Sequence, residues 1–330
     1  METGITRTMV WARAGLPVLL LAWAVPCLLW AAEPETIADS EAYFPDTIGS
    51  RWEYRGSISD GPLQPIEHKG FVNTSTVQGT TTRKGVVVKV FHDSNPGNHG
   101  ASDSFYRRDA VGIVYYGSDP GSNLDRQLTP YQIVRFPLVV PSSFQQFDRK
   151  GVDFGVDLDG DGQNEKADVQ ADVRLLAHEA VTVPARTFDD AIRIEAHMRM
   201  LITFSKEPRT AVGTDTMTAW FARGVGLVKY VEYQELPAVR TTRGIITEIV
   251  EELAEASVKT AGLSESGGEP AAKRILAHHA GGHELEQIPF AAGFCADAGQ
   301  PVAAEGLASH QRAGDRPVDV EIPDVEPLAR

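Results

Sequence analysis

Residues 216–233 read TMTAWFARGVGLVKYVEY, and this stretch decides the fold class. Two runs rich in β-branched and aromatic residues, 216–221 and 226–233, lie on either side of Gly224. Such runs are typical of β-strands, and a glycine between them permits the tight turn that joins antiparallel neighbours. The stretch therefore predicts a β-hairpin.

Runs of the same kind recur through residues 43–250. They lie at 51–55, 85–91, 112–117, 131–136, 166–175 and 191–196. No helical pattern of about 10 to 15 residues separates them, which disfavours a parallel α/β sheet. We therefore predict an all-β protein whose antiparallel sheet curls into a half-barrel or a sandwich. Residues 249–256 are expected to form a last strand that runs into a short helix.

Three local patterns predict buried or turning residues within this sheet. Trp52 and Tyr54 alternate onto one face of a strand and are expected in the core. Phe188 follows a predicted turn and is expected to be buried, whereas Gly224 and Gly226 are expected to form a turn.

Residues 1–32 are predicted to be a secretory signal peptide. Arginines precede an apolar run at 16–25, and Ala31 and Ala32 follow it. The run is short for a membrane span and contains Pro17, so cleavage is favoured over a retained anchor. The mature chain is therefore expected to be exported, either periplasmic or extracellular, with no stable membrane span.

The remaining chain divides by composition into two parts. Residues 33–256 are expected to form the β-domain, and residues 257–330, rich in Gly, Ala, Ser, Glu and Pro, a mostly disordered low-complexity tail. Signal removal takes Cys27 and leaves Cys295 alone, so no internal disulfide is expected. The formal net charge of −14 argues against nucleic acid as a partner.

The segment 157–168, DLDGDGQNEKAD, resembles a calcium-binding loop. Carboxylates at alternate positions, then Gly162 and a fourth acid, supply the hard oxygen ligands that Ca²⁺ prefers. The expected ligands are Asp157, Asp159, Asp161, the main-chain carbonyl of Gln163, Glu165 and, closing the shell, Asp168. Asn164 replaces the aliphatic residue of an EF-hand, and the flanks are strand-like, so a structural Ca²⁺ is expected rather than a sensor. The alternative is a solvated acidic hairpin loop.

Candidate catalytic residues are few. The chain has no nucleophile elbow, phosphate loop, HExxH or CxxC motif. The His92-Asp93 pair is expected at the surface at the end of a strand. His178 and His197 lie on predicted neighbouring strands and could share a metal, but separate roles are favoured. The group His278, His279, His283 and Glu284, together with Cys295, lies in the predicted tail. An enzymatic role is therefore disfavoured.

Four segments together resemble an uncharacterised family of bacterial exported β-domain proteins. They are YFP with GSRWEY at 43–54, FPL at 136–138, VTVPARTF at 181–188 and WFARGVGLVK at 220–229. The family is similar in style to the LolA/LolB-like half-barrels. The resemblance implies an exported β-fold and no particular activity.

Two positions depart from the family's pattern. Arg186 stands where the family has Gly, and Arg223 where it has Pro, so both turns are expected to be altered.

Three functions fit the sequence. The favoured one is an exported non-enzymatic β-domain that binds an apolar ligand or envelope component in the concavity of its sheet and is stabilised by Ca²⁺. The alternatives are a calcium-dependent module that recognises a protein or glycan, and a hydrolase whose site is scattered through the sequence. An apolar pocket would favour the first, a flat aromatic face the second, and a cleft with two carboxylates the third.

Overall fold

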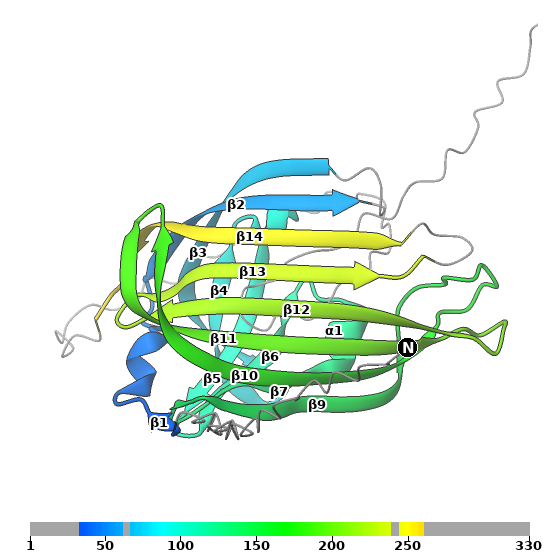
Figure 1. The fold of residues 1–330 in the computed structure, drawn as a ribbon, viewed down its shortest axis with the longest axis horizontal. Helices are drawn as coiled ribbons and strands as arrows, with labels where there is room; N and C mark the ends of the chain where they lie inside the picture. The colour runs from blue at the N-terminus through cyan, green and yellow to red at the C-terminus, as the bar shows by residue number, and fades with distance from the viewer. Residues whose placement is uncertain (1–32, 62–66, 239–243, 261–330) are drawn as a thin grey trace, which may run out of the picture. The chain divides into compact units, whose positions relative to one another are not determined.

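The computed structural model describes residues 33–61, 67–238 and 244–260. The predicted signal peptide and nearly all of the predicted tail lie outside these ranges, as do the tail histidines and Cys295. The described chain from Pro34 onward is almost entirely β-structure, as the sequence predicts (Figure 1).

The strands follow one another closely along the chain. They are β1 (Glu35–Thr36), β2 (Arg51–Gly61), β3 (Glu67–Arg83), β4 (Val86–Asp93), β5 (Ser102–Asp109), β6 (Gly112–Asp119), β7 (Tyr131–Arg135), β8 (Val139–Val140), β9 (Ser142–Asp153), β10 (Lys166–Val183), β11 (Arg186–Thr203), β12 (Thr210–Ala222), β13 (Gly226–Leu236) and β14 (Ile245–Ser257). Short helical turns interrupt them at η1 (Ser40–Tyr43), η2 (Pro96–Asn98) and α1 (Asn123–Leu128). In the described part of the chain, no helix has the length and apolar character needed to cross a membrane.

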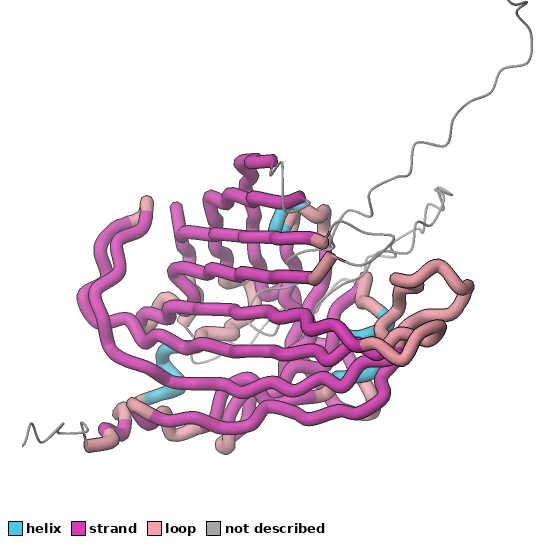
Figure 2. Tube along the Cα trace, turned by 45° about the vertical axis from the view of Figure 1, so that its right-hand side comes forward, coloured by secondary structure: helices cyan, strands magenta, loops and turns pink. Residues whose placement is uncertain are grey.

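One 12-stranded antiparallel sheet holds most of these strands, in the order β7-β6-β5-β4-β3-β2-β14-β13-β12-β11-β10-β9. Almost every strand pairs with its neighbour in the chain, but β14 pairs with β2 and so joins the two ends of the domain. The sheet curls so that β3–β7 pass behind the long strands β9–β14 (Figures 1 and 2). The described strands therefore form one curled sheet of the half-barrel kind and not a sandwich, and β1 and β8 pair in a separate two-stranded sheet.

The two edge strands of the sheet approach each other through side chains. The rings of Tyr131 in β7 and Phe147 in β9 lie 5.0 Å apart, and Arg135 lies 4.2 Å from the ring of Phe144. Gln127 of α1 exchanges two hydrogen bonds of 2.9 Å with the main chain of Asp153. In the described residues, side-chain contacts and α1 thus connect the edge strands β7 and β9, which do not pair through their backbones.

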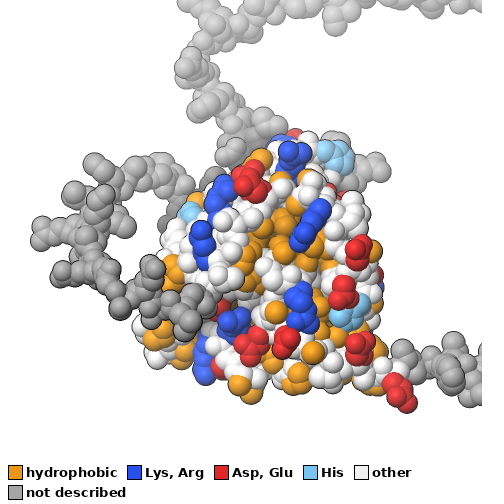
Figure 3. Space-filling view, turned by 90° about the vertical axis from the view of Figure 1, so that its left-hand side faces the viewer, with side chains coloured by type: hydrophobic (Ala, Val, Ile, Leu, Met, Phe, Trp, Pro, Cys, Tyr) orange, Lys and Arg blue, Asp and Glu red, His pale blue; other side chains and the backbone are white. Residues whose placement is uncertain are grey.

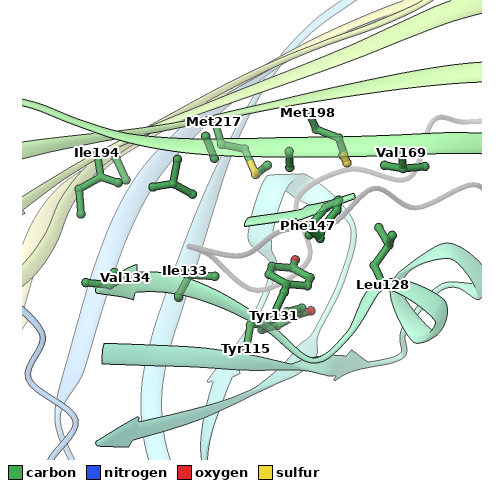
Figure 4. Close-up of a cluster of buried hydrophobic side chains, with 14 of the residues drawn as sticks. Tyr115, Leu128, Tyr131, Ile133, Val134, Phe147, Val169, Ile194, Met198 and Met217 are labelled. Carbon is green, nitrogen blue, oxygen red and sulfur yellow. The ribbon is translucent and has the colours of Figure 1, made fainter. Parts of the chain in front are cut away.

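The hydrophobic core fills the space between the two halves of the sheet. Figure 4 shows Tyr115, Tyr131 and Ile133 of β6 and β7 facing Met198 and Met217 of β11 and β12. Side chains alternate between the two faces of a strand, so every second residue of these strands points to this inner face, and these positions are mostly occupied by apolar side chains. Burying this surface is the main favourable contribution to folding.

The local expectations for core residues are confirmed. Trp52 and Tyr54 are 4% and 3% exposed, and Phe188 is 8% exposed just after the β10–β11 turn. The expectation of a helix near residue 256 is wrong, because β14 remains extended to Ser257 and pairs there with β2.

The two arginines that depart from the family pattern lie at the β10–β11 and β12–β13 hairpins. Arg223 donates to the carbonyl of Ala38 at 2.6 Å and lies 5.1 Å from the ring of Tyr43, which ties the β12–β13 turn to η1. Arg186 lies 4.5 Å from the ring of Phe188. Each guanidinium therefore covers an aromatic ring beside its turn.

Candidate functional site

A pocket opens inside the curl, at the end of the sheet that carries η1 and the β12–β13 turn. The room for the centres of water-sized molecules is about 110 Å³, and the space without atoms is about 820 Å³ when the mouth open to solvent is counted. Its apolar lining comes from η1 and the residue after it (Tyr43, Phe44), β2 (Trp52, Tyr54), β4 (Phe91), β6 and β7 (Ile113, Ile133, Val134), and β12 and β13 (Phe221, Leu227). Figure 3 faces this end of the sheet and shows hydrophobic side chains gathered near its centre, with Lys and Arg side chains beside them.

Aromatic rings form a continuous row along the inner face of the sheet. Trp52 stacks near Phe91 at 6.3 Å, and Phe91 meets Tyr106 edge-on at 5.3 Å. The row continues from Tyr106 through Tyr115 to Tyr131, with centroids 5.4 and 5.3 Å apart. Such contacts hold large apolar rings in fixed positions. The pocket wall is therefore preformed.

The polar ends of the wall residues are satisfied by the main chain of β13 and the turn before it. Trp52 Nε1 donates to the carbonyl of Val225 at 2.6 Å, and the Tyr54 hydroxyl donates to that of Leu227 at 3.1 Å. Both hydrogen bonds tie the polar atoms of these rings to the protein, so these atoms are not left unpaired in an apolar wall.

The segment after η1 packs closely against the β12–β13 turn. Gly226 has φ +97°, and a Cβ there would lie 3.2 Å from Pro45 Cδ. Arg108 of β5 also holds this segment in place. It pairs with Asp46 at 2.9 Å and donates a hydrogen bond to the carbonyl of Phe44 at 2.8 Å. The segment thus forms one wall of the pocket.

Two buried acids, Asp93 in the pocket lining and Glu251 near it, share one hydrogen-bond partner, and the sequence analysis missed their association. Asn73 Nδ2 donates to Asp93 Oδ1 at 3.1 Å and to Glu251 Oε2 at 3.3 Å. The N–H of Gly97 donates to Glu251 Oε1 at 3.0 Å. Asp93 lines the pocket, whereas Asn73 and Glu251 are not among the lining residues.

Burial makes these acids hard to ionise. Desolvation, with a smaller contribution from the charge of Glu251, raises the pKa of Asp93 to about 8. Desolvation also raises the pKa of Glu251 to about 7, despite its hydrogen bonds from Gly97 and Asn73. The Asp93 carboxyl is therefore mostly protonated and neutral at pH 7.

The sequence contains a signal that predicts Glu251 to be a buried residue. Ile249 and Leu253, two positions away on either side, are 0% and 1% exposed, so period 2 places Glu251 on the same inner face. Its partner Asn73 could not be found in this way, because it is 178 positions away in the sequence.

The histidine candidates lie apart from one another. His92 points away from Asp93 and bonds Asp103 at 2.7 Å at the surface, so only the histidine of that pair lies where the sequence predicts. Across β10 and β11, His197 faces Asp172, whereas His178 faces Ile192. The register therefore does not bring the two histidines together.

The acidic segment forms the loop between β9 and β10. Oxygen atoms of Asp157, Asp159 and Glu165 lie within 4.8 Å of one another. Glu165 is fully buried, and its carboxylate accepts N–H bonds from Leu158 at 3.1 Å, Asp159 at 3.2 Å and Ser205 at 2.9 Å. Glu165 therefore anchors this loop to the neighbouring β11–β12 loop.

The three aspartates of the loop differ in the hydrogen bonds that their carboxylates accept. Asp157 accepts N–H bonds from Gly162 and Gly160 at 2.8 and 2.7 Å, and the bond from Gly162 is the first cause that lowers its pKa. Asp159 Oδ1 is buried without a hydrogen-bond partner in the described structure. Asp161 accepts bonds from the Ser205 hydroxyl at 2.9 Å and the Gln163 N–H at 2.8 Å.

Asp168 lies outside this group of three. It sits in β10, accepts a hydrogen bond from Gly151 at 2.9 Å and lies 3.6 Å from Lys150. Its carboxylate is thus engaged with the neighbouring strand β9.

Comparisons with known proteins show similarity to solved structures only. No protein-family model matches the chain, and no curated protein matches it. A "putative lipoprotein" from Parabacteroides distasonis is 17% identical, with 65% of this chain and 98% of that chain covered and a TM-score of 0.30. A "putative exported protein with YmcC-like fold" from Bacteroides fragilis is 12% identical, with coverage of 65% and 98% and a TM-score of 0.28. At such identities and TM-scores, these similarities do not establish a function for this chain.

Proposed function

We propose that this protein is an exported, non-enzymatic β-domain that holds an apolar ligand or envelope component inside its curled sheet. The observation that carries the proposal is the preformed aromatic pocket at the η1 end of the sheet. Export is supported by the composition of residues 1–32.

The chemistry of the pocket favours an apolar occupant. Its rings are held by mutual contacts and their polar atoms bond to the protein, so little of the wall competes for polar groups of a ligand. Each Å² of apolar surface that a ligand buries there contributes about 25 cal/mol. A preformed wall also lowers the entropy cost of binding.

The buried acid pair does not make a hydrolase the better proposal. A two-carboxylate mechanism needs both groups to reach the substrate. Asp93 lines the pocket, but Glu251 is not among the lining residues and accepts hydrogen bonds from Asn73 and the Gly97 N–H. This arrangement supports a structural role for Glu251.

Two measurements test the pocket. Native mass spectrometry of protein from its own host is expected to show a retained apolar molecule. Phe91→Ala is expected to weaken binding of a fluorescent apolar probe about fivefold to tenfold, because it removes a ring from the wall. Val87→Ala, four residues before Phe91 in the same strand and 65% exposed, is the matched control because Val87 does not line the pocket. Equal probe binding by both variants and the unmodified protein would contradict the proposal.

We further propose that Ca²⁺ binds the loop between β9 and β10. The convergent oxygens of Asp157, Asp159 and Glu165, with the unpartnered Asp159 Oδ1, support this proposal. Asp161, the Gln163 carbonyl and Asp168 complete the ligand set expected from the sequence. Bonds from Ser205 and Lys206 to this loop would let the ion stabilise the β11–β12 loop as well.

A further inference from the structure

One cationic side chain in the pocket has no partner. Lys89 lines the pocket from β4, on the same face as Phe91, and its cross-strand neighbour in β5 is Tyr106. Within the described residues it makes no hydrogen bond or ion pair. An ammonium group beside apolar walls gains more from a counter-ion than one in open water, because the local dielectric constant is lower.

The other charged groups of the pocket do not neutralise Lys89. Arg108 and Asp46 already pair with each other at 2.9 Å. Asp93 lies four residues further along β4, which is about 13 Å in an extended strand. Its carboxyl is also mostly neutral at pH 7, because burial raises its pKa to about 8. The pocket therefore carries one uncompensated positive charge.

We propose that the ligand is an amphiphile with a single apolar chain and an anionic head group, and that Lys89 pairs with that head. The inference rests on the proposed function and specifies the ligand class of the same pocket. The chain would lie along the row of rings between Trp52 and Tyr106, with the carboxylate or phosphate at the Lys89 ammonium. A charge-assisted hydrogen bond of this kind adds both affinity and orientation.

Three probes that share one chain test the proposal: hexadecanoate, hexadecyl phosphate and hexadecan-1-ol. Each is titrated below its aggregation concentration into the unmodified protein and into Lys89→Met, which keeps most of the apolar stem and removes the charge. We expect Lys89→Met to weaken binding of at least one anion about tenfold and to change binding of the alcohol less than about twofold. Comparison of the two anions distinguishes a carboxylate from a phosphate head.

Two further variants serve as controls. Lys89→Arg keeps the charge and is expected to retain most of the affinity for the preferred anion. Lys150→Met removes an exposed lysine on β9, 66% exposed, and is expected to leave all three affinities unchanged.

The outcomes separate the inference from the proposed function. Equal losses for the anions and the alcohol in Lys89→Met would overturn the head-group inference and leave the apolar pocket standing. Unchanged binding of both anions would do the same. Failure of all three probes to bind the unmodified protein would overturn both.

Discussion

The pocket and the acidic loop are built in opposite ways. The loop takes its candidate ligands from twelve consecutive residues, 157–168, and main-chain N–H groups orient Asp157 among them. The pocket takes its wall from residues between Tyr43 and Leu227, which meet only because the sheet curls and β14 joins β2. A local site depends on turn chemistry, whereas a distributed site depends on the register of the whole sheet.

The largest expected effect concerns three buried acids, Asp93 and Glu251 near the pocket and Asp215 in β12. Asp93, Glu251 and Asp215 have pKa values raised by burial to about 8, 7 and 7. Because their folded pKa values lie above the unfolded values, the stability they contribute is full below about pH 4 and is lost as the pH rises through 7 to 8. The free energy of unfolding is expected to fall by up to about 1.4 kcal/mol per pH unit for each acid that titrates.

Denaturant unfolding at several pH values between 4 and 8 measures this loss. Asp93→Asn keeps the shape of the side chain and is expected to flatten the profile. Asp119→Asn, an exposed acid, is expected to leave it unchanged. Parallel profiles for Asp93→Asn and the unmodified protein would show that Asp93 does not titrate in this range.

The next effect concerns the local site. Ca²⁺ is expected to bind with a dissociation constant on the order of 10⁻⁴ to 10⁻³ M, since strand flanks do not provide a sensor geometry. At a hundredfold excess over that constant, binding stabilises the protein by about 2.7 kcal/mol. Calorimetric melting of chelator-treated protein with and without Ca²⁺ measures the shift, and Mg²⁺ is expected to do much less.

Asp159→Ala is expected to abolish the calcium effect, because it removes a ligand oxygen and keeps the turn glycines. Asp168→Ala tests whether Asp168 belongs to the ligand set, since its carboxylate accepts a hydrogen bond from Gly151 of β9 in the structure. Equal melting midpoints with and without Ca²⁺ in the unmodified protein would mean that the loop is a solvated acidic hairpin.

A smaller effect tests the wall formed by the segment after η1. Arg108→Met removes the ion pair with Asp46 and the hydrogen bond to Phe44, and is expected to cost about 1 to 2 kcal/mol of stability. It should also weaken binding of an apolar probe by opening the wall. Arg107→Met, which breaks an exposed pair with Asp109, is the control. Similar losses in both variants would argue against a fastening role for Arg108.

The smallest effect concerns the C-terminal segment. Truncation after residue 260 is expected to leave the melting midpoint nearly unchanged, because the removed sequence has no periodic apolar face. The cut is placed beyond the predicted boundary at 256 because β14 extends to Ser257 and the N–H of Lys259 bonds Ser50 Oγ at 3.0 Å. A drop of several degrees would show that later residues pack on the β-domain.

The sequence by itself determined what depends on neighbouring residues. Strand runs such as 226–233, the glycine turn at Gly224 and the inward positions of Trp52 and Tyr54 follow from period-2 alternation and backbone freedom. The acidic loop was found for the same reason, since spacing within one turn places its carboxylates together. The six-residue helix α1 was not predicted, because one turn and a half carries too little periodic signal.

Only the tertiary structure decided what depends on pairings between distant strands. Asn73 meets Glu251 because β14 pairs with β2 and β2 with β3, and the sequence does not state that register. The same curl places Lys89 and Phe91 in the lining of a pocket. Closure of the sheet is a property of all its strands together, so the pocket, its raised pKa values and its unpaired cation became visible only in three dimensions.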